Sequence, residues 1–362
     1  MSITLEEAQK IVCEHAAVVE YETMPAVFCV GRILAEDVTA QMDQPPFPRS
    51  AMDGYAVRSE DTKGASASHP VRLKVSGRIY AGDRTGEEAA PGEAVRIMTG
   101  GAIPKGADCV VRQEDTDRGT DIVELYKELE PWTNYCQKGE DFQAGECLAE
   151  KGSSMDAYAI GAVSAAGIRE LRVYRRIRAA IVTTGDELCM PGEPLKSGKI
   201  YDSNMAYLMA RLMQAGCEIS GTYMAGDKKE TICESIRRAG ENSDFIITTG
   251  GVSVGEKDLI PGVMELIGAE ILFHGIALKP GMPTMFSVLD GIPVLSLSGN
   301  PYSASTMFEL LAKPLMAAMG GAKDTGLKVR TGIMSNDFYK RSPRRRVLRG
   351  IYDGTNVLVP EG

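Results

Sequence analysis

Acidic residues follow glycines at the ends of two apolar runs in the second half of the chain. Asp186 and Glu187 end the segment 181–187 (IVTTGDE), and Asp258 ends the segment 246–258 (IITTGGVSVGEKD). Carboxylate oxygens are the ligands that Mg²⁺ prefers, and a bound cation can bridge to a phosphate. We therefore predict that Asp186 and Glu187 handle a divalent cation, while Asp258 adds a carboxylate at the entrance of a helix. The alternative is that each carboxylate only closes a surface turn or caps a helix.

A glycine-rich turn lies between the second apolar run and Asp258. Gly250, Gly251 and Gly255 allow the backbone to approach an anion closely, and Ser253 adds a hydroxyl group. The turn has neither the Gly-Lys-Ser/Thr of a Walker loop nor the GxGxxG pattern. It is typical of a phosphate cradle, and the simpler alternative is a turn that only closes a strand.

A third apolar run, 294–301 (VLSLSGNP), ends in the same way. Asn300 can cap a helix that has Pro301 in its first turn, which leaves Ser298 and Ser303 for a ligand. Lys279, in the run ALKPG, is expected to contact an anion rather than to be a solvated loop charge.

Strands and helices alternate around these three segments, as in a three-layer α/β domain. The carboxyl ends of neighbouring parallel strands lie along one edge of a sheet, so the three segments are expected to converge on one crevice. Asp290-Gly291 predicts the turn of a hairpin. The predicted strands are 179–184, 218–224, 245–249 and 271–277, and the predicted helices are 203–215, 229–239, 259–267 and 302–319.

The rest of the chain has other patterns. Apolar spacing predicts a helix over 5–19 with Thr4 as its N-cap, and another helix over 154–166. The segment 44–143 contains short β-prone runs between Gly, Pro and Asp clusters, which predicts a compact β domain. After Gly321 the pattern becomes β-prone again. This last part carries a basic cluster: Arg341, Arg344, Arg345, Arg346 and Arg349.

Composition narrows the class of protein. The chain has 362 residues with 44% hydrophobic content, which suggests two or three domains. Its net charge of -9 disfavours nucleic acid as a partner. Its eight cysteines are scattered without a CxxC pair, which favours mostly buried thiols over a zinc site or disulfides. No secretory signal and no membrane-spanning run is found, so we expect no membrane partner and a cytoplasmic location.

Seven ordered motifs together resemble the MoeA family, the molybdopterin molybdenumtransferases, to which the gephyrin E domain is related. The resemblance extends from the first predicted helix to about Gly362. The motifs are PPFPRSAMDGYAVR (45–58), VRIMTGGAIPKGADCVVRQED (95–115), KGED (138–141), TTGDEL, TTGGVSVGEKD, LKPGMPT and LSGNPYSA.

The resemblance implies a multidomain α/β plus β fold and a homodimer. It implies an elongated, helical and extended linker domain (1–43 and 144–177), an inserted β domain (44–143), a MogA-like three-layer α/β domain (178–322) and a truncated C-terminal β domain (323–362). The C-terminal domain is expected to be truncated because family members continue past the equivalent of Gly362.

The implied activity is insertion of molybdate into adenylylated molybdopterin with Mg²⁺ and release of AMP. Alternatives are a molybdopterin-binding or scaffold protein without turnover, or a molybdopterin adenylyltransferase. Further implied partners are the adenylyltransferase and the enzymes that accept the cofactor.

The family motifs also imply roles for single residues. The implied catalytic residues are Asp53, Thr99, Asp141, Glu187 and Asp258, of which the first three come from the partner subunit's β domain. The implied substrate-binding residues are Gly250, Gly251, Ser253, Gly255, Lys279, Ser298, Asn300, Ser303 and Arg344, and the implied metal ligands are Asp186, Glu187 and Asp258. The alternative for Asp53 is a turn-forming Asp-Gly. Asp202 and Asp227 are as well interpreted as helix N-caps.

Two positions depart from the family pattern. Met282 stands where many relatives carry a second lysine, and Ser298 stands where many carry proline. The expected oxyanion pocket therefore holds fewer positive charges, to which the arginine cluster can add.

Overall fold

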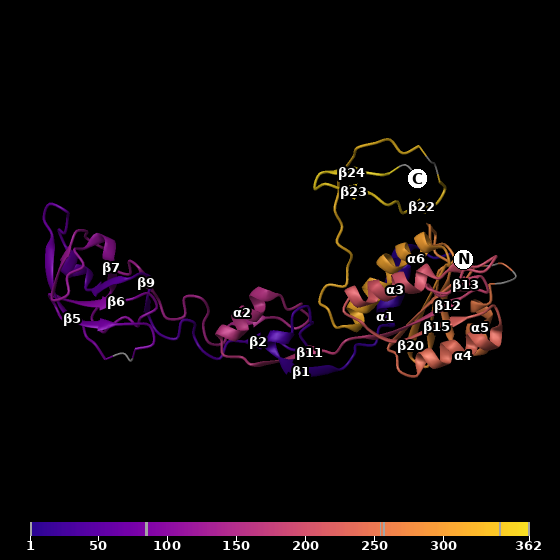
Figure 1. Ribbon diagram of the computed structural model, residues 1–362, viewed down its shortest axis with the longest axis horizontal. Helices are drawn as coiled ribbons and strands as arrows, with labels where there is room; N and C mark the ends of the chain where they lie inside the picture. Colours follow the sequence, from indigo (N-terminus) through magenta and orange to yellow (C-terminus); the bar gives the residue numbers. More distant parts are fainter. Residues whose placement is uncertain (1, 84–85, 254, 256–257, 340–341, 361–362) are drawn as a thin grey trace. The chain divides into compact units, whose positions relative to one another are not determined.

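The computed structural model describes residues 2–83, 86–253, 255, 258–339 and 342–360, and Figure 1 labels its helices and strands. The chain divides into two compact units. Unit 1 consists of Met1–Glu36, Lys151–Asp156 and Glu170–Gly362, and unit 2 consists of Asp37–Glu150 and Ala157–Arg169. The described helices include none that is both long enough and apolar enough to cross a bilayer.

A six-stranded sheet forms the centre of unit 1. Its order is β15 (Glu218–Ala225), β12 (Arg178–Thr184), β16 (Phe245–Thr249), β20 (Ile292–Leu297), β19 (Met285–Leu289) and β17 (Glu270–His274). The first four strands are parallel, whereas β19 is antiparallel to both of its neighbours. The strands β12, β16 and β20 are almost entirely buried, because helices cover both faces of the sheet.

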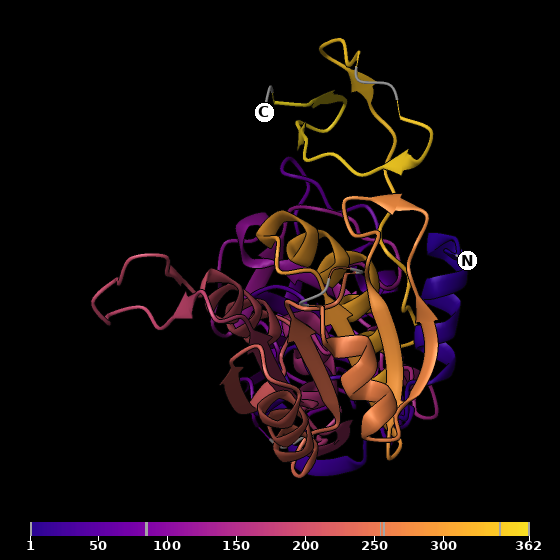
Figure 2. The same cartoon turned by 90° about the vertical axis from the view of Figure 1, so that its right-hand side faces the viewer.

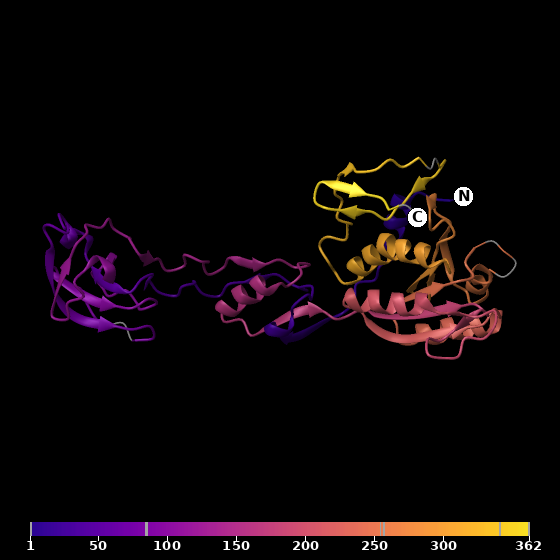
Figure 3. The ribbon, with the colours of Figure 1, turned by 45° about the horizontal axis from the view of Figure 1, so that its top comes forward.

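Two separate hydrophobic cores lie on the two faces of this sheet. The side chains of β12 alternate between them: Ile181 packs against α1 (Leu5–Glu14) and α3 (Ser203–Gln214), whereas Val182 packs against α4 (Lys229–Gly240) and α5 (Ile260–Leu266). Figures 2 and 3 show the resulting helix, sheet and helix layers. The predicted three-layer arrangement is therefore present in unit 1.

The predicted helix boundaries hold within a few residues, except at two places. Thr4 caps α1 through a capping box with Glu7, as predicted, but α1 ends at Glu14 and not at residue 19. It ends there because the following backbone turns away, and Val19 donates to the carbonyl of Met319. Helix α2 (Ala157–Ala165) begins three residues later than predicted, since Ser154 pairs with Ile33 as a β-bridge instead.

The last predicted helix is one helical run with a wide turn in its middle. It comprises α6 (Pro301–Met307), the π-helical segment η4 (Phe308–Ala312) and α7 (Lys313–Met319). Pro314 has no backbone N–H, so the carbonyl of Leu310 loses its usual helical partner. The side chain of Gln9 donates to that carbonyl at 3.0 Å instead. The π-helical segment thus has an identifiable local cause.

Unit 2 is built on a five-stranded sheet. Its order is β7 (Cys109–Arg112), β4 (Gly54–Val57), β6 (Glu93–Ile97), β5 (Val71–Ile79) and β8 (Ile122–Leu125). Tyr55, Leu73 and Val111 belong to the core on one face, and Ala56, Ile79 and Val110 belong to the core on the other. This sheet confirms that the segment after residue 44 is β-rich.

Short strands and helical turns complete the two units. Three pairs of short strands belong to unit 1: β1 (Tyr21–Pro25) with β11 (Glu170–Tyr174), β13 (Leu188–Cys189) with β14 (Ile200–Tyr201), and β18 (Leu278–Lys279) with β22 (Arg345–Arg346). Unit 1 also contains a small three-stranded sheet in the order β21 (Ile333–Met334), β24 (Asn356–Leu358) and β23 (Ile351–Tyr352). In unit 2, β2 (Val38–Thr39) pairs with β10 (Cys147–Ala149), and β3 (Arg49–Ser50) with β9 (Tyr135–Cys136). The 3₁₀ turns are η1 (Ala26–Phe28), η2 (Ser59–Thr62) and η3 (Gln113–Asp115). All eight cysteines are free, but only four are buried, fewer than the composition suggested.

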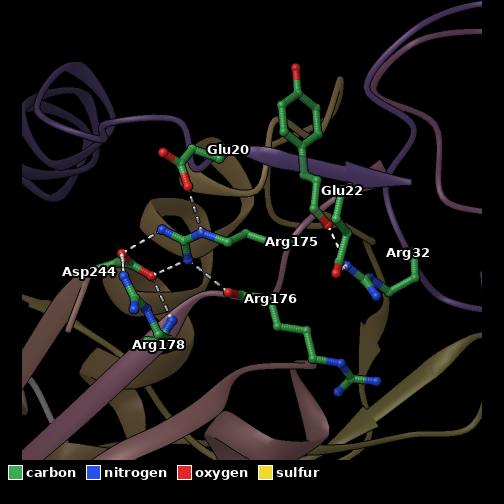
Figure 4. Close-up of polar contacts among 8 residues, drawn as sticks. Glu20, Glu22, Arg32, Arg175, Arg176, Arg178 and Asp244 are labelled. Atoms are coloured by element: carbon green, nitrogen blue, oxygen red, sulfur yellow. Dashed lines mark hydrogen bonds and ion pairs between the residues drawn. The ribbon is translucent and has the colours of Figure 1, made fainter. Parts of the chain in front are cut away.

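An ion-pair network joins β11 and β12 to the loop before β16 (Figure 4). Asp244 accepts hydrogen bonds from both terminal nitrogens of Arg175, at 2.6 and 2.8 Å, and from the backbone N–H of Arg178 at 2.8 Å. Burial alone raises the pKa of Asp244, but hydrogen bonds from Arg175 and Arg178 outweigh it and lower the pKa to about 2. The network therefore stabilises the folded state when Asp244 is charged.

We expect Asp244→Asn to destabilise the protein at neutral pH by about 2 kcal/mol. The folded pKa of Asp244 lies below its unfolded value, so this stability is present above about pH 4 and is lost as the pH falls toward 2. Urea unfolding at several pH values measures the effect. The matched control is Glu20→Gln, since Glu20 is 88% exposed and lies 3.7 Å from Arg175. An equal loss in both variants would contradict the assignment.

Candidate functional site

The polar segments predicted from the sequence converge at the carboxyl edge of the unit 1 sheet. Strand pairing aligns Thr184 with Ala225, Thr183 with Thr249, and Thr249 with Leu297. The loops after β15, β12, β16 and β20 therefore leave the sheet side by side. Because Met285 pairs with Ser296, the loop between β17 and β19, which contains Lys279, lies at the same edge.

The glycine turn after β16 lies at the centre of this edge. Gly250 has a φ of +95°, and a Cβ atom there would lie 2.3 Å from the carbonyl oxygen of Thr184. Its N–H donates to the carbonyl of Leu297 at 3.1 Å, and a Cβ on Gly299 would lie 3.5 Å from the Cα of Gly250. Only a residue without a side chain fits between the three loops at this point.

Asn204 joins two of the loops and was missed by the sequence reasoning. Its side-chain nitrogen donates to the hydroxyl of Thr249 and to the carbonyl of Gly299, both at 2.9 Å. The Thr249 hydroxyl in turn donates to the carbonyl of Ser298 at 3.2 Å. The signal in the sequence was an asparagine two residues after Asp202, the predicted N-cap of the same helix.

Several buried polar atoms at this edge have no hydrogen-bond partner within the described residues. They are the hydroxyl oxygens of Thr184 and Ser303, Oδ1 of Asn204 and Oδ2 of Asp202. Asp202 does cap α3, since its Oδ1 accepts from the N–H of Met205 at 2.9 Å. Unpaired buried polar atoms are uncommon, and they cluster where water or a ligand completes a site.

The three candidate metal ligands lie on two loops. Asp186 and Glu187 lie on the loop after β12, and Asp258 lies on the loop after β16. Asp186 Oδ1 accepts from the N–H of Asp227 at 3.0 Å, and Asp258 Oδ2 accepts from the N–H of Gly255 at 2.7 Å. The Glu187 carboxylate lies over Gly185 and accepts no hydrogen bond from the described residues. The described residues contain no cluster of three His, Cys, Asp or Glu side chains that could hold a metal ion.

The interpretation of Asp227 as an N-cap is wrong. Helix α4 has Lys228 at its N-cap without a side-chain hydrogen bond, and Asp227 uses its backbone N–H to hold Asp186. Asn300 does cap α6, because its Oδ1 accepts from the N–H of Ser303 at 3.1 Å. Ser298 accepts from the N–H of Asn300 at 3.3 Å, and Ser253 is half-buried in the glycine-rich turn.

Basic residues flank the loop that contains Lys279. Strand β18 pairs with β22, so Lys279 lies beside Arg346, and the carbonyl of Lys279 accepts from the N–H of Val347 at 2.9 Å. The Lys279 side chain is exposed and forms no ion pair within the described residues. Arg344 contacts the sulfur of Met282, the position that departs from the family pattern. Of the predicted arginine cluster, Arg341 lies outside the described residues.

The remaining three candidates belong to unit 2. Asp53 Oδ1 accepts from the backbone N–H and from the hydroxyl of Thr99, both at 2.7 Å. These bonds lower the pKa of Asp53 below its usual value, and the charge of Arg96 lowers it further. Asp141 is instead half-exposed and lies 3.8 Å from Arg49. Asp53 and Thr99 are thus one pair, which the sequence could not show.

Comparison with known proteins identifies the family. The family described as MoeA N-terminal region (domain I and II) matches residues 3–167, and the one described as probable molybdopterin binding domain matches residues 180–318. A protein of Mycobacterium tuberculosis named molybdopterin molybdenumtransferase 2 is 35% identical over 355 residues, covering 97% of this chain and 88% of the relative. The chain belongs to the molybdopterin molybdenumtransferase (MoeA) family. A second MoeA relative, the molybdopterin molybdenumtransferase of Staphylococcus epidermidis, is 34% identical and covers 99% of this chain and 87% of the relative.

A solved MoeA structure supports the same conclusion. The molybdopterin biosynthesis moeA protein from Pyrococcus horikoshii OT3 matches with a TM-score of 0.86 and 30% identity, covering 100% of this chain and 91% of that chain. The predicted fold class, multidomain α/β plus β, is therefore confirmed, as is the predicted class of enzyme at the level of the MoeA family. The boundaries of the four predicted domains and the roles of the single site residues stay predictions.

Proposed function

We propose that this chain inserts molybdate into adenylylated molybdopterin and releases AMP. The observation that carries the proposal is the convergence of the glycine turn at Gly250, three carboxylates and Lys279 on one edge of the unit 1 sheet. The family gives independent support, since its relatives are named molybdopterin molybdenumtransferases and molybdopterin binding is the description of the matching α/β family.

The residues at this edge suit a reaction between two anions. The substrate carries a phosphoanhydride linkage and molybdate is a dianion, so the two repel each other unless the protein offsets their charges. Backbone N–H groups of the glycine turn can donate to phosphate oxygens. Lys279, in the loop between β17 and β19, and Arg344, which contacts Met282 of that loop, add positive charge. Asn204, with Thr249 and Gly299, keeps two of the loops in a fixed relation and so pre-organises the site.

The carboxylates fit a role in holding Mg²⁺, which belongs to this proposal. Neither oxygen of Glu187 accepts a hydrogen bond from the part of the chain that the structure describes, and Asp186 and Asp258 each engage one oxygen with a backbone N–H. Mg²⁺ is typically bound by one or two carboxylates together with water and substrate phosphates, so a preformed cluster of three ligands is not required. When bound, the cation would neutralise charge that develops on the phosphate.

Other parts of the proposal come from the family alone. They are a homodimeric assembly, a cytoplasmic location, and exchange of substrate and product with the molybdopterin adenylyltransferase and with enzymes that accept the cofactor. The same proposal includes a shared site, in which one subunit contributes Asp53, Thr99 and Asp141 to the sheet edge of its partner.

Incubation of the full chain with adenylylated molybdopterin, molybdate and Mg²⁺ tests the proposal. We expect AMP to be released and the product to activate a cofactor-free molybdenum enzyme, and excess chelator to slow AMP release by about 100-fold or more. AMP is measured by chromatography. Binding of the substrate without AMP release would favour a scaffold instead, and transfer of adenylate from ATP to molybdopterin would favour an adenylyltransferase. Full turnover in chelator would contradict the role of the cation.

A further inference from the structure

Unit 2 contains a small cavity lined by basic side chains. The cavity has a volume of about 200 Å³. Three arginines line it, Arg78, Arg96 and Arg118, together with Tyr55 and the turn at Gly119, and none of its lining residues is acidic. The chain as a whole has a net charge of -9, so these three guanidinium groups without a carboxylate make the cavity a local site of positive charge.

Arg96 is held in place from two sides and still has a free donor. Its guanidinium carbon lies 4.8 Å from the centre of the Tyr55 ring, and one terminal nitrogen donates to Gln113 at 2.8 Å. The other terminal nitrogen, Nη1, is buried and has no hydrogen-bond partner within the described residues. A buried charged donor without an acceptor costs free energy, which an anion in the cavity would recover.

The other two arginines are available for the same ligand. Arg78 is exposed and, among the described residues, its side chain donates only to the hydroxyl of Tyr80, at 3.3 Å; Arg118 has its backbone in the left-handed region at a φ of 61°. Neither forms an ion pair within the described residues. Strand pairing places Arg78 directly beside Arg96, and Arg96 directly beside Tyr55.

Hydrogen bonds fix the turn that carries Arg118. Asp117 Oδ1 accepts from the N–H groups of Gly119 and Glu124, both at 2.9 Å, and the carbonyl of Gly119 accepts from the hydroxyl of Tyr55 at 2.8 Å. A Cβ on Gly119 would lie 1.7 Å from the carbonyl oxygen of Ile122, so only glycine fits at this point of the turn. Arg96 and the start of the Arg118 side chain are therefore pre-organised across the cavity.

We propose that Arg78, Arg96 and Arg118 bind a tetrahedral oxyanion of the phosphate class in unit 2. The planar guanidinium fork matches two oxygens of such an anion, and the cavity of about 200 Å³ has room for it. Phosphate and molybdate share this chemistry. Gln113 connects this site to the pair of Asp53 and Thr99. Its side-chain oxygen accepts from Arg96, and its backbone N–H donates to the carbonyl of Asp53 at 3.0 Å.

Calorimetric titration of the full chain with inorganic phosphate, molybdate and AMP tests this inference. We expect phosphate or molybdate to bind with an affinity that falls as salt rises, and the double variant Arg78→Gln with Arg118→Gln to weaken it about tenfold. Neither side chain is buried, so this variant is expected to fold. Arg96→Lys keeps the charge but loses the fork and is expected to weaken binding as well.

The matched control is Arg72→Gln. Arg72 is an exposed arginine on β5, the strand that carries Arg78, but its side chain pairs with Glu124 at 3.5 Å. Tungstate soaked into crystals of the protein would locate the anion by its anomalous scattering. An anomalous peak among the three arginines, with affinity lost in the double variant and kept in the control, supports the site. Equal affinity in all variants, or a peak only in unit 1, overturns it, as does a double variant that weakens the binding of AMP but not that of phosphate or molybdate.

Discussion

Glu187→Gln and Asp258→Asn are each expected to slow AMP release by about 100- to 1,000-fold. Both changes remove a negative charge that would hold the cation against the substrate phosphate. Neither is expected to unfold the chain: Glu187 accepts no hydrogen bond from the described residues, and asparagine at 258 can still accept from the N–H of Gly255. Single-turnover release of AMP, at a Mg²⁺ concentration that saturates the unaltered chain, measures the effect, with thermal unfolding as the test of folding.

Glu265→Gln is the matched control for this pair, because Glu265 is an exposed carboxylate on α5 away from the carboxyl edge. Its rate is expected to equal that of the unaltered chain. If raising Mg²⁺ restores the rate of Glu187→Gln, the residue binds the cation. Unchanged rates in both variants would show that these carboxylates serve only their turns.

Gly250→Ala is expected to combine a large loss of stability with loss of activity. The new Cβ would lie 2.3 Å from the carbonyl oxygen of Thr184 and 2.8 Å from its hydroxyl, at a φ of +95°. Because Thr184 ends a buried strand, it cannot move far, so the glycine turn must move instead. We expect about 2–4 kcal/mol of destabilisation, and turnover lost because the turn no longer faces the phosphate. Urea unfolding and AMP release measure the two effects.

Gly268→Ala separates the clash from the backbone strain. Gly268 has a φ of +82°, and a Cβ atom there would have no neighbour within 4 Å, so alanine at this position carries only the conformational penalty. We expect about 1 kcal/mol of destabilisation and full activity. If the two variants lost equal stability, close approach of the Thr184 loop would not be the reason for glycine at 250.

The sequence determined the elements that carry the site. Apolar runs with glycine and a polar residue behind them predicted β12, β16 and β20 within a few residues, and Asn300 with Pro301 predicted the start of α6. These features depend on residues that are neighbours along the chain, such as a cap and the N–H three residues later. The order of the motifs was enough to predict the MoeA family and its fold class.

Only the tertiary structure decided which side chains meet. Asn204 contacts Thr249 and Gly299, Asp53 contacts Thr99, and Arg96 stacks on Tyr55, although long stretches of chain separate the members of each pair. It also showed that the N-cap interpretation of Asp227 was wrong, because the N–H of Asp227 instead binds the carboxylate of another loop. Strand order and register bring such residues together, and a pattern read along one segment does not contain them.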